Sequence, residues 1–491
     1  MPRRPMHMSD AAKAALRTAL QKLRTDLHAP AAFPAPVLEA ADAAAHSPRL
    51  PDKDATHLPL FTIDPPTSKD LDQAMYLERR PGGGFRVYYA IADVAAFVVP
   101  GGALDAEAQK RIVTLYFPDG KVALYPPALS EGAASLLPDQ TVPALLWQHD
   151  LDAHGEVTTS YVSRALVRSK AKLDYAGVQH SIDSGTAEES VALLRDIGTL
   201  REAVEAARGG ISLTLPEQEV TFEDGSFRLS YRAPLPVDGW NEQISLMTGM
   251  AAARMMLDSG PGILRTQDMA PTHEVTRLHR IAQGLGIDWP HHVSYAELIR
   301  SLDPHDQKHA AFLHEAAGAL LLKSVYKSFR DHDHIPEQTS HAAIAAPYTH
   351  CTAPLRRLVD RYAGELCVAS CAGQAPPDWV LAALDGLPIT MAKAKGSAAD
   401  RQSVDLVEAA VLMDRVGGIF DATVIDTDEE EVPPNRREGQ VQMAEPAVVG
   451  RVTSADVDLK LGASVRVRLE RADPAFSDRN KKILFSLVQD W

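Results

Sequence analysis

Three aspartates lie close together in the stretch FTIDPPTSKDLDQAM, residues 61–75. They are Asp64, Asp70 and Asp72. The proline after Asp64 disfavours helix at that position and favours the extended end of a strand. If the chain is extended at Asp70 and Asp72, both side chains leave the same face, and a turn at PPTSK brings Asp64 back toward them. The spacing therefore predicts three converging carboxylates.

Converging carboxylates repel one another unless a cation lies between them. Hard oxygen ligands suit Mg²⁺ or Mn²⁺, which keep several waters and bind a substrate phosphate. This is the arrangement used in two-metal phosphodiester hydrolysis. The alternative is an ordinary acidic loop, because aspartate is common where helices are capped and Asx turns form.

A second candidate element is YTHCTAPLRRLVDRY, residues 348–362. The pattern predicts a helix over 354–372. Pro354 suits its first turn, with Thr352 or Ala353 as the cap.

This expected helix carries arginines in its first two turns. Arg356, Arg357 and Arg361 would join backbone N–H groups in binding a phosphate, since guanidinium groups and a helix N-terminus both favour anions. The alternative is a surface helix in which Arg357, Asp360 and Arg361 form ion pairs. Both interpretations remain open from this segment alone.

The composition is typical of a soluble globular protein with several domains. The chain has 491 residues, more than one typical core of about 100–150 residues. It is 45% hydrophobic and 23% charged, with a formal net charge of −15. That charge disfavours binding nucleic acid through the whole surface, yet it permits an enzyme that holds RNA in a local basic channel.

The sequence indicates neither a membrane protein nor a secreted one. No apolar run approaches the roughly 20 residues of a membrane span, and the basic start lacks the apolar core of a secretion signal. The three cysteines, Cys351, Cys367 and Cys371, favour a reducing cytoplasm and buried apolar positions over disulfides or zinc. We expect a cytoplasmic monomer, because no oligomerisation surface is legible.

Three segments differ in pattern. Residues 1–57 predict a helical unit, with one helix over 9–27 capped by Ser9 and a shorter one in VLEAADAAA. This unit resembles half of a helix-turn-helix, but we favour a packing appendage because no basic recognition helix is visible. Residues 58–415 mix strands and helices without regular alternation, which favours an α+β domain. Residues 416–491 predict a small β-barrel, best matched by the OB fold.

The elements expected in the α+β segment include several strands. LFTID, AMYLERR, FRVYYAIADV and the two halves of TVPALLWQHDLDAHGEVTTSYVSRALVRS are strand candidates, and Pro81 to Gly84 is a hairpin turn. LDAEAQKRIVTLYF is helix-like. The barrel strands are expected in GIFDATVID, VQMAEPAVVGRV, LGASVRVRLERAD and KKILFSLV. Longer helical patterns cover residues 187–208, 241–258, 272–285, 308–330, 354–372 and 401–416.

Together these pieces resemble the ribonuclease II and ribonuclease R (RNB) family of exoribonucleases. The matching stretches are FTIDPPTSKDLDQAM, YYAIADVAAFVVPGGALDAEAQKR, LYPPALSEGAASLLPDQTVPAL, SKAKLDYAGVQ and YTHCTAPLRRLVDRY. They occur in the family's order and at its separations. The resemblance covers roughly residues 58–415, and the final barrel resembles the family's OB-type RNA-binding domain.

The resemblance implies an RNA-degrading enzyme. It implies processive, Mg²⁺-dependent hydrolysis of single-stranded RNA from the 3′ end to nucleoside 5′-monophosphates and a short end product, with Mn²⁺ as a substitute. By motif, Asp64, Asp70 and Asp72 are the metal ligands, and Asp72 is the most sensitive. Arg356 holds the scissile phosphate, and Arg357 is a further RNA-binding residue.

Two tyrosines gain a role only through the resemblance. Tyr116 matches an aromatic residue that stacks on a base near the 3′ end, and Tyr175 matches a tyrosine beside the terminal nucleotide. The partner of the base-stacking aromatic aligns loosely with Leu213. Without the resemblance, both tyrosines would be read as core aromatics.

The chain departs from the family at several places. Gln73 stands where a fourth aspartate is usual, and we expect it to be a weak metal ligand or to lie behind the ligands. Ala353 replaces a serine. The family's two cold-shock domains do not fit into 57 residues, so we expect a channel mouth open enough for RNA with a structured part and a 3′ overhang.

Two other functions remain open at this stage. One is a catalytically weakened RNA-binding adaptor on the same fold, which the departures at Gln73 and Ala353 would explain. The other is a metal-dependent phosphohydrolase for small phosphate esters, which would explain the carboxylates and Arg356 but not the final barrel.

Overall fold

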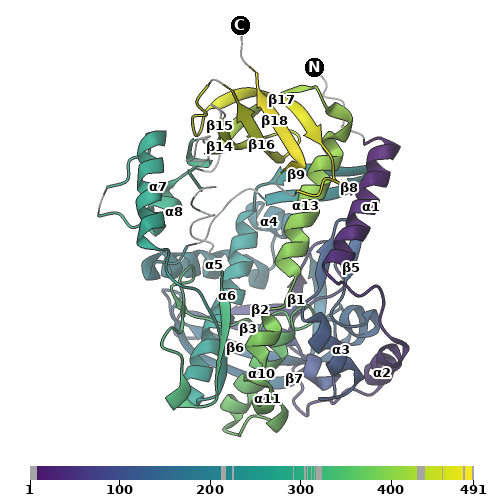
Figure 1. Ribbon diagram of the computed structural model, residues 1–491. Helices are drawn as coiled ribbons and strands as arrows, with labels where there is room; N and C mark the ends of the chain where they lie inside the picture. The colour runs from purple at the N-terminus through teal and green to yellow at the C-terminus, as the bar shows by residue number, and fades with distance from the viewer. Residues whose placement is uncertain are drawn as a thin grey trace.

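The computed structural model contains two closed five-stranded β-barrels, with helices between and around them (Figure 1). The expected α+β domain followed by a small barrel is therefore confirmed. The structure describes residues 8–211, 217–223, 226–290, 292–303, 306, 308–310, 312–313, 316, 323–427, 437–455, 457–478 and 481–488.

The first barrel is a mixed sheet closed on itself. Its neighbours pair antiparallel except β1 and β7, which run parallel and close the ring. The strands predicted from period-two patterns are all present. In barrel order they are β1 (Leu60–Ile63), β2 (Gln73–Arg79), β3 (Phe85–Ala92), β6 (Thr141–Leu151) and β7 (Val157–Leu173).

The hairpin turn between β2 and β3 requires glycine. Gly82, Gly83 and Gly84 all have positive φ angles, of 89°, 104° and 78°. A Cβ added at Gly84 would lie 2.2 Å from the carbonyl oxygen of Leu151, so a larger residue would push β3 away from β6. The predicted turn is confirmed.

The N-terminal segment contains the two predicted helices, α1 (Asp10–Asp26) and α2 (Ala35–His46). The Oγ of Ser9 accepts the N–H of Ala12 at 3.1 Å, which caps α1 as expected. Helix α1 packs along α13 (Gly396–Leu412), and Ser9 also donates to the carboxylate of Asp414. The unit is thus fastened to the rest of the molecule.

The central helices cover the first barrel. Helix α6 packs against α5 and α10, and the buried side chains of these helices join those of the barrel in one apolar core. Most lie where the 3.6-residue period predicted helix. The bounds are α3 (Ala103–Arg111), α4 (Tyr175–Asp183), α5 (Glu189–Arg208), α6 (Pro236–Ser259), α7 (Thr272–Leu285), α8 (Tyr295–Ser301), α10 (Leu358–Ala372), α11 (Asp378–Ala383) and α12 (Leu387–Met391).

Two helical expectations were wrong in part. The pattern over 308–330 ends in a strand, β11 (Val325–Phe329), which pairs with β10 (Gly262–Thr266); much of the remainder lies outside the described residues. The pattern LDAEAQKRIVTLYF stays helical only to Arg111. Ile112 leaves the helix with φ of 68°.

The chain then forms a hairpin, β4 (Leu115–Phe117) with β5 (Gly120–Val122). Helical periodicity in LDAEAQKRIVTLYF masked the turn signal Pro118-Asp119-Gly120, which is typical of a tight turn. A further hairpin joins β8 (Glu217–Glu223) to β9 (Ser226–Arg232), and β12 (Ser340–His341) pairs with β13 (Ala346–Pro347).

The C-terminal barrel follows the order β14-β15-β16-β18-β17. The segment VQMAEPAVVGRV, expected as one strand, is divided around Pro446, which has no N–H to donate to a ladder. The apolar core of this barrel is continuous with the buried faces of α1 and α13. The strands are β14 (Ile419–Thr427), β15 (Arg437–Met443), β16 (Val448–Ser454), β17 (Ser464–Ala472) and β18 (Ile483–Leu487).

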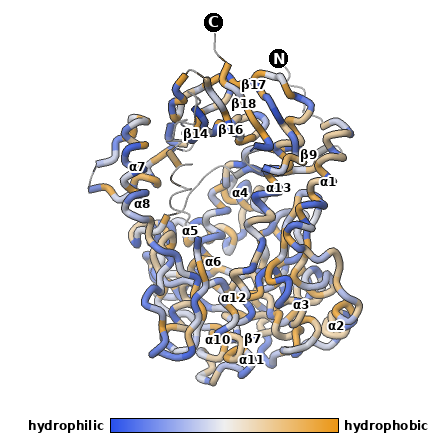
Figure 2. Tube along the Cα trace, viewed as in Figure 1, coloured by the Kyte–Doolittle hydropathy of each residue, from blue (hydrophilic) through white to orange (hydrophobic). Residues whose placement is uncertain are grey.

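Hydrophobic and hydrophilic residues alternate along the helices (Figure 2). Within the part of the chain that the structure describes, no helix combines the length and apolar character needed to cross a bilayer.

Candidate functional site

The acidic loop connects β1 to β2 at one end of the first barrel. Asp64 follows β1 directly, and its N–H donates to the carbonyl of Leu173 at 3.0 Å. Lys172 holds the intervening turn by donating its Nζ to the carbonyls of Pro66 and Ser68, at 2.7 and 2.6 Å. The predicted turn at PPTSK is therefore present.

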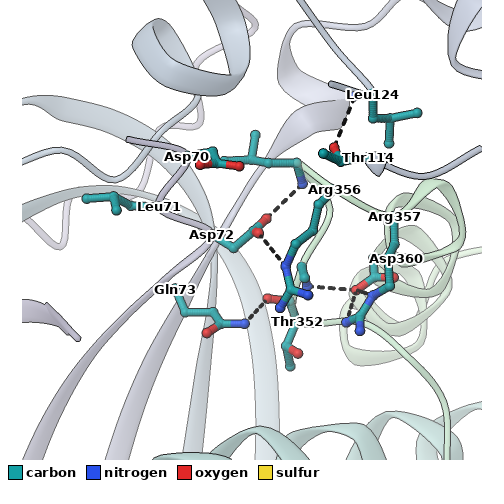
Figure 3. A network of polar contacts seen from close by, with 12 residues as sticks. Asp70, Leu71, Asp72, Gln73, Thr114, Leu124, Thr352, Arg356, Arg357 and Asp360 are labelled. Carbon is teal, nitrogen blue, oxygen red and sulfur yellow. Dashed lines mark hydrogen bonds and ion pairs between the residues drawn. The ribbon is translucent and has the colours of Figure 1, made fainter. Parts of the chain in front are cut away.

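Asp72 joins this loop to a segment far along the chain. Its Oδ1 accepts the N–H of Leu355 at 2.7 Å, and its Oδ2 accepts Nε of Arg356 at 3.3 Å (Figure 3). The carboxylate is only 5% exposed, and burial raises its pKa to about 7 against the opposing effect of Arg356. The structure thus brings together two residues that the sequence placed in separate motifs.

Arg356 does not lie in a helix, contrary to the sequence expectation. Helix α10 begins at Leu358, so Pro354 is not in its first turn, and neither Thr352 nor Ala353 is its cap.

Long-range pairing explains the late start. Val113 forms a β-bridge with Arg357, and Thr114 donates its N–H to the carbonyl of Arg356 at 3.0 Å. These contacts hold Arg357 extended, while residues 353–356 form a turn in which the N–H groups of Arg356 and Arg357 donate to the carbonyl of Ala353 at 3.2 and 3.0 Å. The phosphate site that we expected at a helix N-terminus is therefore replaced by a side-chain site, with Arg356 42% exposed.

The other two arginines are held in ion pairs. Arg357 contacts Asp360 at 2.8 Å, and Arg361 is buried and contacts Asp105 at 2.7 Å. The expected pair of Arg357 with Asp360 is thus confirmed, but α10 is largely buried and is not the surface helix of that alternative, and Arg361 has a different partner. A role of Arg357 toward RNA stays a prediction, since Asp360 already engages its guanidinium.

Asp70 has a partner that the sequence did not reveal. Nζ of Lys121 lies 2.8 Å from Oδ1 of Asp70 and 2.9 Å from Oε1 of Glu131. Lys121 is the cross-strand partner of Tyr116 in the β4–β5 hairpin. The turn signal after Phe117 could have predicted this hairpin, and with it the common face of Tyr116 and Lys121.

The two candidate tyrosines lie near different aspartates. Tyr116 is 42% exposed, and burial of its phenol together with the charge of Asp70 raises its pKa above the ordinary value. The hydroxyl of Tyr175, at the start of α4, accepts Nδ2 of Asn241 at 3.2 Å. Burial, and then the charge of Asp64, raise the pKa of Tyr175 to about 12.

The side-chain amide nitrogen of Gln73 is engaged in a hydrogen bond to the backbone and is not directed at a metal ion. Its Nε2 donates to the carbonyl of Thr352 at 2.6 Å (Figure 3). This bond ties the start of β2 to the segment that carries Arg356. Leu213, the expected partner of Tyr116 in base stacking, lies outside the described residues.

The three carboxylates differ in whether another side chain is already paired with them. Among the described residues, no three acidic, histidine or cysteine side chains are arranged to hold one ion together. Asp72 faces Arg356, and Asp70 faces Lys121. Only Asp64 has a buried oxygen, Oδ2, without a hydrogen-bond partner.

The charge of a second acid also acts on the carboxyl group of Asp64. Burial, and to a smaller extent the charge of Asp70, raise the pKa of Asp64 to about 6, although the hydroxyl of Thr62 and then the charges of Lys172 and Arg356 oppose the shift. An unpartnered buried carboxylate oxygen beside another acid fits a hard divalent cation.

Two known domain families match successive parts of the chain. The RNB domain matches residues 52–367, and the RNase II-type exonuclease C-terminal S1 domain matches residues 419–478. The apo form of ribonuclease R from Mycoplasma genitalium superposes with a TM-score of 0.80 at 19% identity, covering 96% of this chain and 78% of that one. At this identity the likeness concerns the fold alone.

Two curated relatives cover a similar part of the chain. Ribonuclease R of Escherichia coli (strain K12) is 30% identical over an alignment of 324 residues, and the match covers 62% of this chain and 39% of that protein. The protein named inactive exonuclease DIS3L2 of Arabidopsis thaliana is 29% identical over an alignment of 339 residues, and the match covers 63% of this chain and 32% of that protein. The matched region is thus well under half of either relative.

Proposed function

The chain belongs to the RNB-domain family, and from this membership we propose that it is a 3′→5′ exoribonuclease. It hydrolyses single-stranded RNA processively, releases nucleoside 5′-monophosphates and leaves a short end product. RNA with a structured part and a 3′ overhang is a second substrate class. The enzyme acts as a monomer in the cytoplasm.

The contact between Asp72 and Arg356 carries this proposal. It joins a buried carboxylate to a half-exposed guanidinium whose remaining N–H groups can face a phosphate. Guanidinium forks bind phosphate oxygens with good geometry. Because Asp72 fixes the Nε side of Arg356, the arginine is preorganised before RNA arrives.

The protein's own groups bind and orient the RNA. Tyr116 presents an exposed ring for a base, and such stacking is worth about 1–3 kcal/mol. Tyr175 lies near Asp64, where the terminal nucleotide would sit. The C-terminal barrel, of a type that binds oligonucleotides, holds the RNA further from the site. Leu213 and Arg357 are assigned to RNA binding on the resemblance alone.

A divalent cation belongs with this chemistry. The residues that would hold it are Asp64, with its unpartnered oxygen, and its neighbours Asp70 and Asp72. When bound, Mg²⁺, or Mn²⁺ in its place, supplies an activated water and stabilises the leaving oxygen. The two-metal arrangement expected from the sequence stays a prediction, which a count of the bound ions tests.

A catalytically weakened RNA-binding adaptor is the second candidate. Two observations favour it. Gln73 brings no carboxylate to the site and donates a hydrogen bond to Thr352, and the carboxylate of Asp70 is already paired with Lys121. A related protein is also named as inactive. The small-ester phosphohydrolase keeps less support, because it leaves Tyr116 and the C-terminal barrel without a role.

One experiment separates these functions. The full chain is incubated with 5′-labelled poly(A) and, separately, with a small phosphate ester, each with and without Mg²⁺. A cation-dependent ladder that shrinks to a short product supports the exoribonuclease. Binding of intact RNA supports the adaptor, and cleavage of the ester alone supports the phosphohydrolase.

A further inference from the structure

The ammonium group of Lys121 lies inside the acidic site. It contacts Asp70 at 2.8 Å and Glu131 at 2.9 Å, and the three side chains are 25%, 13% and 26% exposed. This is not an exposed surface pair of the kind that contributes little. Two carboxylates on one lysine leave one of its three N–H donors without a partner among the described residues.

Two anchors hold Lys121 in this position. Glu131 belongs to the short helical segment η2 (Leu129–Ala133), which is separate from the acidic loop. The turn that precedes Lys121 is tied to α1, because Arg24 pairs with Asp119 at 2.5 Å. The position of the lysine is therefore set by the hairpin and by Glu131, and does not depend on Asp70 alone.

The charges of the site leave room for one divalent ion. Asp64, Asp70, Asp72 and Glu131 supply four negative charges, and Gln73 supplies none. Lys121, which Asp70 and Glu131 share, and Arg356, which faces Asp72, supply two positive charges. The two negative charges that remain match the charge of one divalent ion. Among these three aspartates, the buried carboxylate oxygen without a hydrogen-bond partner is on Asp64. A second divalent ion at Asp70 would have to displace a lysine that Glu131 also holds.

We propose that Lys121 is a resident cation of the site, which takes the place of a second divalent ion at Asp70, so that the chain binds a single divalent ion. This inference rests on the proposed function, since it assigns Lys121 to the site of phosphodiester hydrolysis. The free N–H of Lys121 faces the RNA, where it and Arg356 together neutralise the scissile phosphate.

Counting bound Mn²⁺ tests the proposal without measuring activity. Free Mn²⁺ is followed by electron paramagnetic resonance during titration of the full chain. We expect one Mn²⁺ per wild-type chain and two per chain for Lys121→Met, which frees Asp70. Lys121→Arg and Gln73→Asp should each keep one, because both leave a cation at Asp70. Lys110→Met, at a 74% exposed lysine of α3, is the matched control and should also keep one.

Several counts of bound Mn²⁺ would overturn the proposal for Lys121. A wild-type count other than one overturns the proposal even if the variants are unstable. So does a count of one for a folded Lys121→Met chain, with Lys121→Gln as the second variant if the methionine variant does not fold. A count of two for Gln73→Asp alone would assign the missing ion to Gln73. Degradation of RNA is assayed in parallel, so that loss of the proposed function is recognised separately from a wrong ion count.

Discussion

The side-chain amide of Gln73 donates to the backbone carbonyl of Thr352 at 2.6 Å, across 279 positions of the chain. This bond links the first residue of β2 to the segment that presents Arg356. A residue that looks like a lost metal ligand in the sequence is thus a structural link between two parts of the site. Both aspects can be measured.

Gln73→Asp should lower the Mg²⁺ concentration needed for half-maximal RNA degradation. The added negative charge attracts the bound cation more strongly, and this gain should exceed the loss of the bond to Thr352. The measurement is a Mg²⁺ titration of the degradation rate. Gln73→Leu is the control that loses the bond without adding charge. An unchanged Mg²⁺ requirement in Gln73→Asp would mean that position 73 acts only through Thr352.

Arg356→Ala should reduce the rate of the chemical step far more than RNA affinity. Removing one preorganised donor to a developing charge costs on the order of 10²–10³ in kcat. Single-turnover kinetics and RNA binding are measured together. Arg330→Ala is the matched control, because Arg330 is also paired with an aspartate, Asp385, but on an exposed surface. A loss confined to RNA affinity would show that Arg356 only binds.

The N-terminal helix should support RNA binding through the hairpin that carries Tyr116. Arg24 pairs with Asp119 in the turn, and its guanidinium lies 4.3 Å from the ring centre of Phe117. Such partly exposed pairs contribute about 0.2–1 kcal/mol. Arg24→Ala should therefore weaken RNA binding roughly 1.4- to fivefold, as should Asp119→Ala. If Arg24 and Asp119 act through one ion pair, the double variant should lose no more RNA affinity than either single variant. A double variant whose loss of affinity equals the sum of the two single losses would contradict this.

The free energy of unfolding should fall in acid partly because of His149. This histidine is buried in β6 between the hydroxyls of Ser160 and Thr248, and burial lowers its pKa to about 3. Between its ordinary value of 6.5 and that value, the unfolded chain binds a proton that the folded chain does not. Stability from this group is complete above pH 6.5 and is lost by up to about 1.4 kcal/mol per pH unit as the pH falls.

Urea unfolding at several pH values checks this prediction. His149→Gln keeps a hydrogen-bonding side chain but cannot be protonated, so its stability should fall less steeply between pH 6.5 and 4. His57→Gln, at an exposed histidine, is the control and should follow the wild type. Parallel curves for His149→Gln and wild type would show that His149 is not a source of the acid sensitivity.

Sequence patterns predicted the local parts of this structure well. The cap at Ser9, the turn after β2 and the acidic loop depend on neighbours within a few residues. The late start of α10 could not be predicted, since it depends on Val113 and Thr114 pairing with residues more than 240 positions away. For the same reason, closure of the first barrel through parallel β1 and β7 was not visible.

Only those residues of the site that lie within recognisable sequence motifs could be predicted. The resemblance of two separate motifs to the RNB family placed Asp72 and Arg356 in one site, and the structure joins them. Lys121 was missed because its meaning depends on a hairpin that turns its side chain toward Asp70 and on Glu131 behind it. A lysine in a hairpin has no chemical signature until its partners are known.

The site around Asp72 and Arg356 is the one that we propose degrades RNA. Asp72→Asn tests it most directly, because asparagine keeps an oxygen for the N–H of Leu355 but removes the charge that faces Arg356. With 5′-labelled poly(A) and Mg²⁺, the wild type should produce a ladder that shrinks to a short product. The variant should bind RNA within about threefold of wild type and degrade it at least about 10²-fold more slowly. Equal degradation by the folded variant and the wild type would contradict the account.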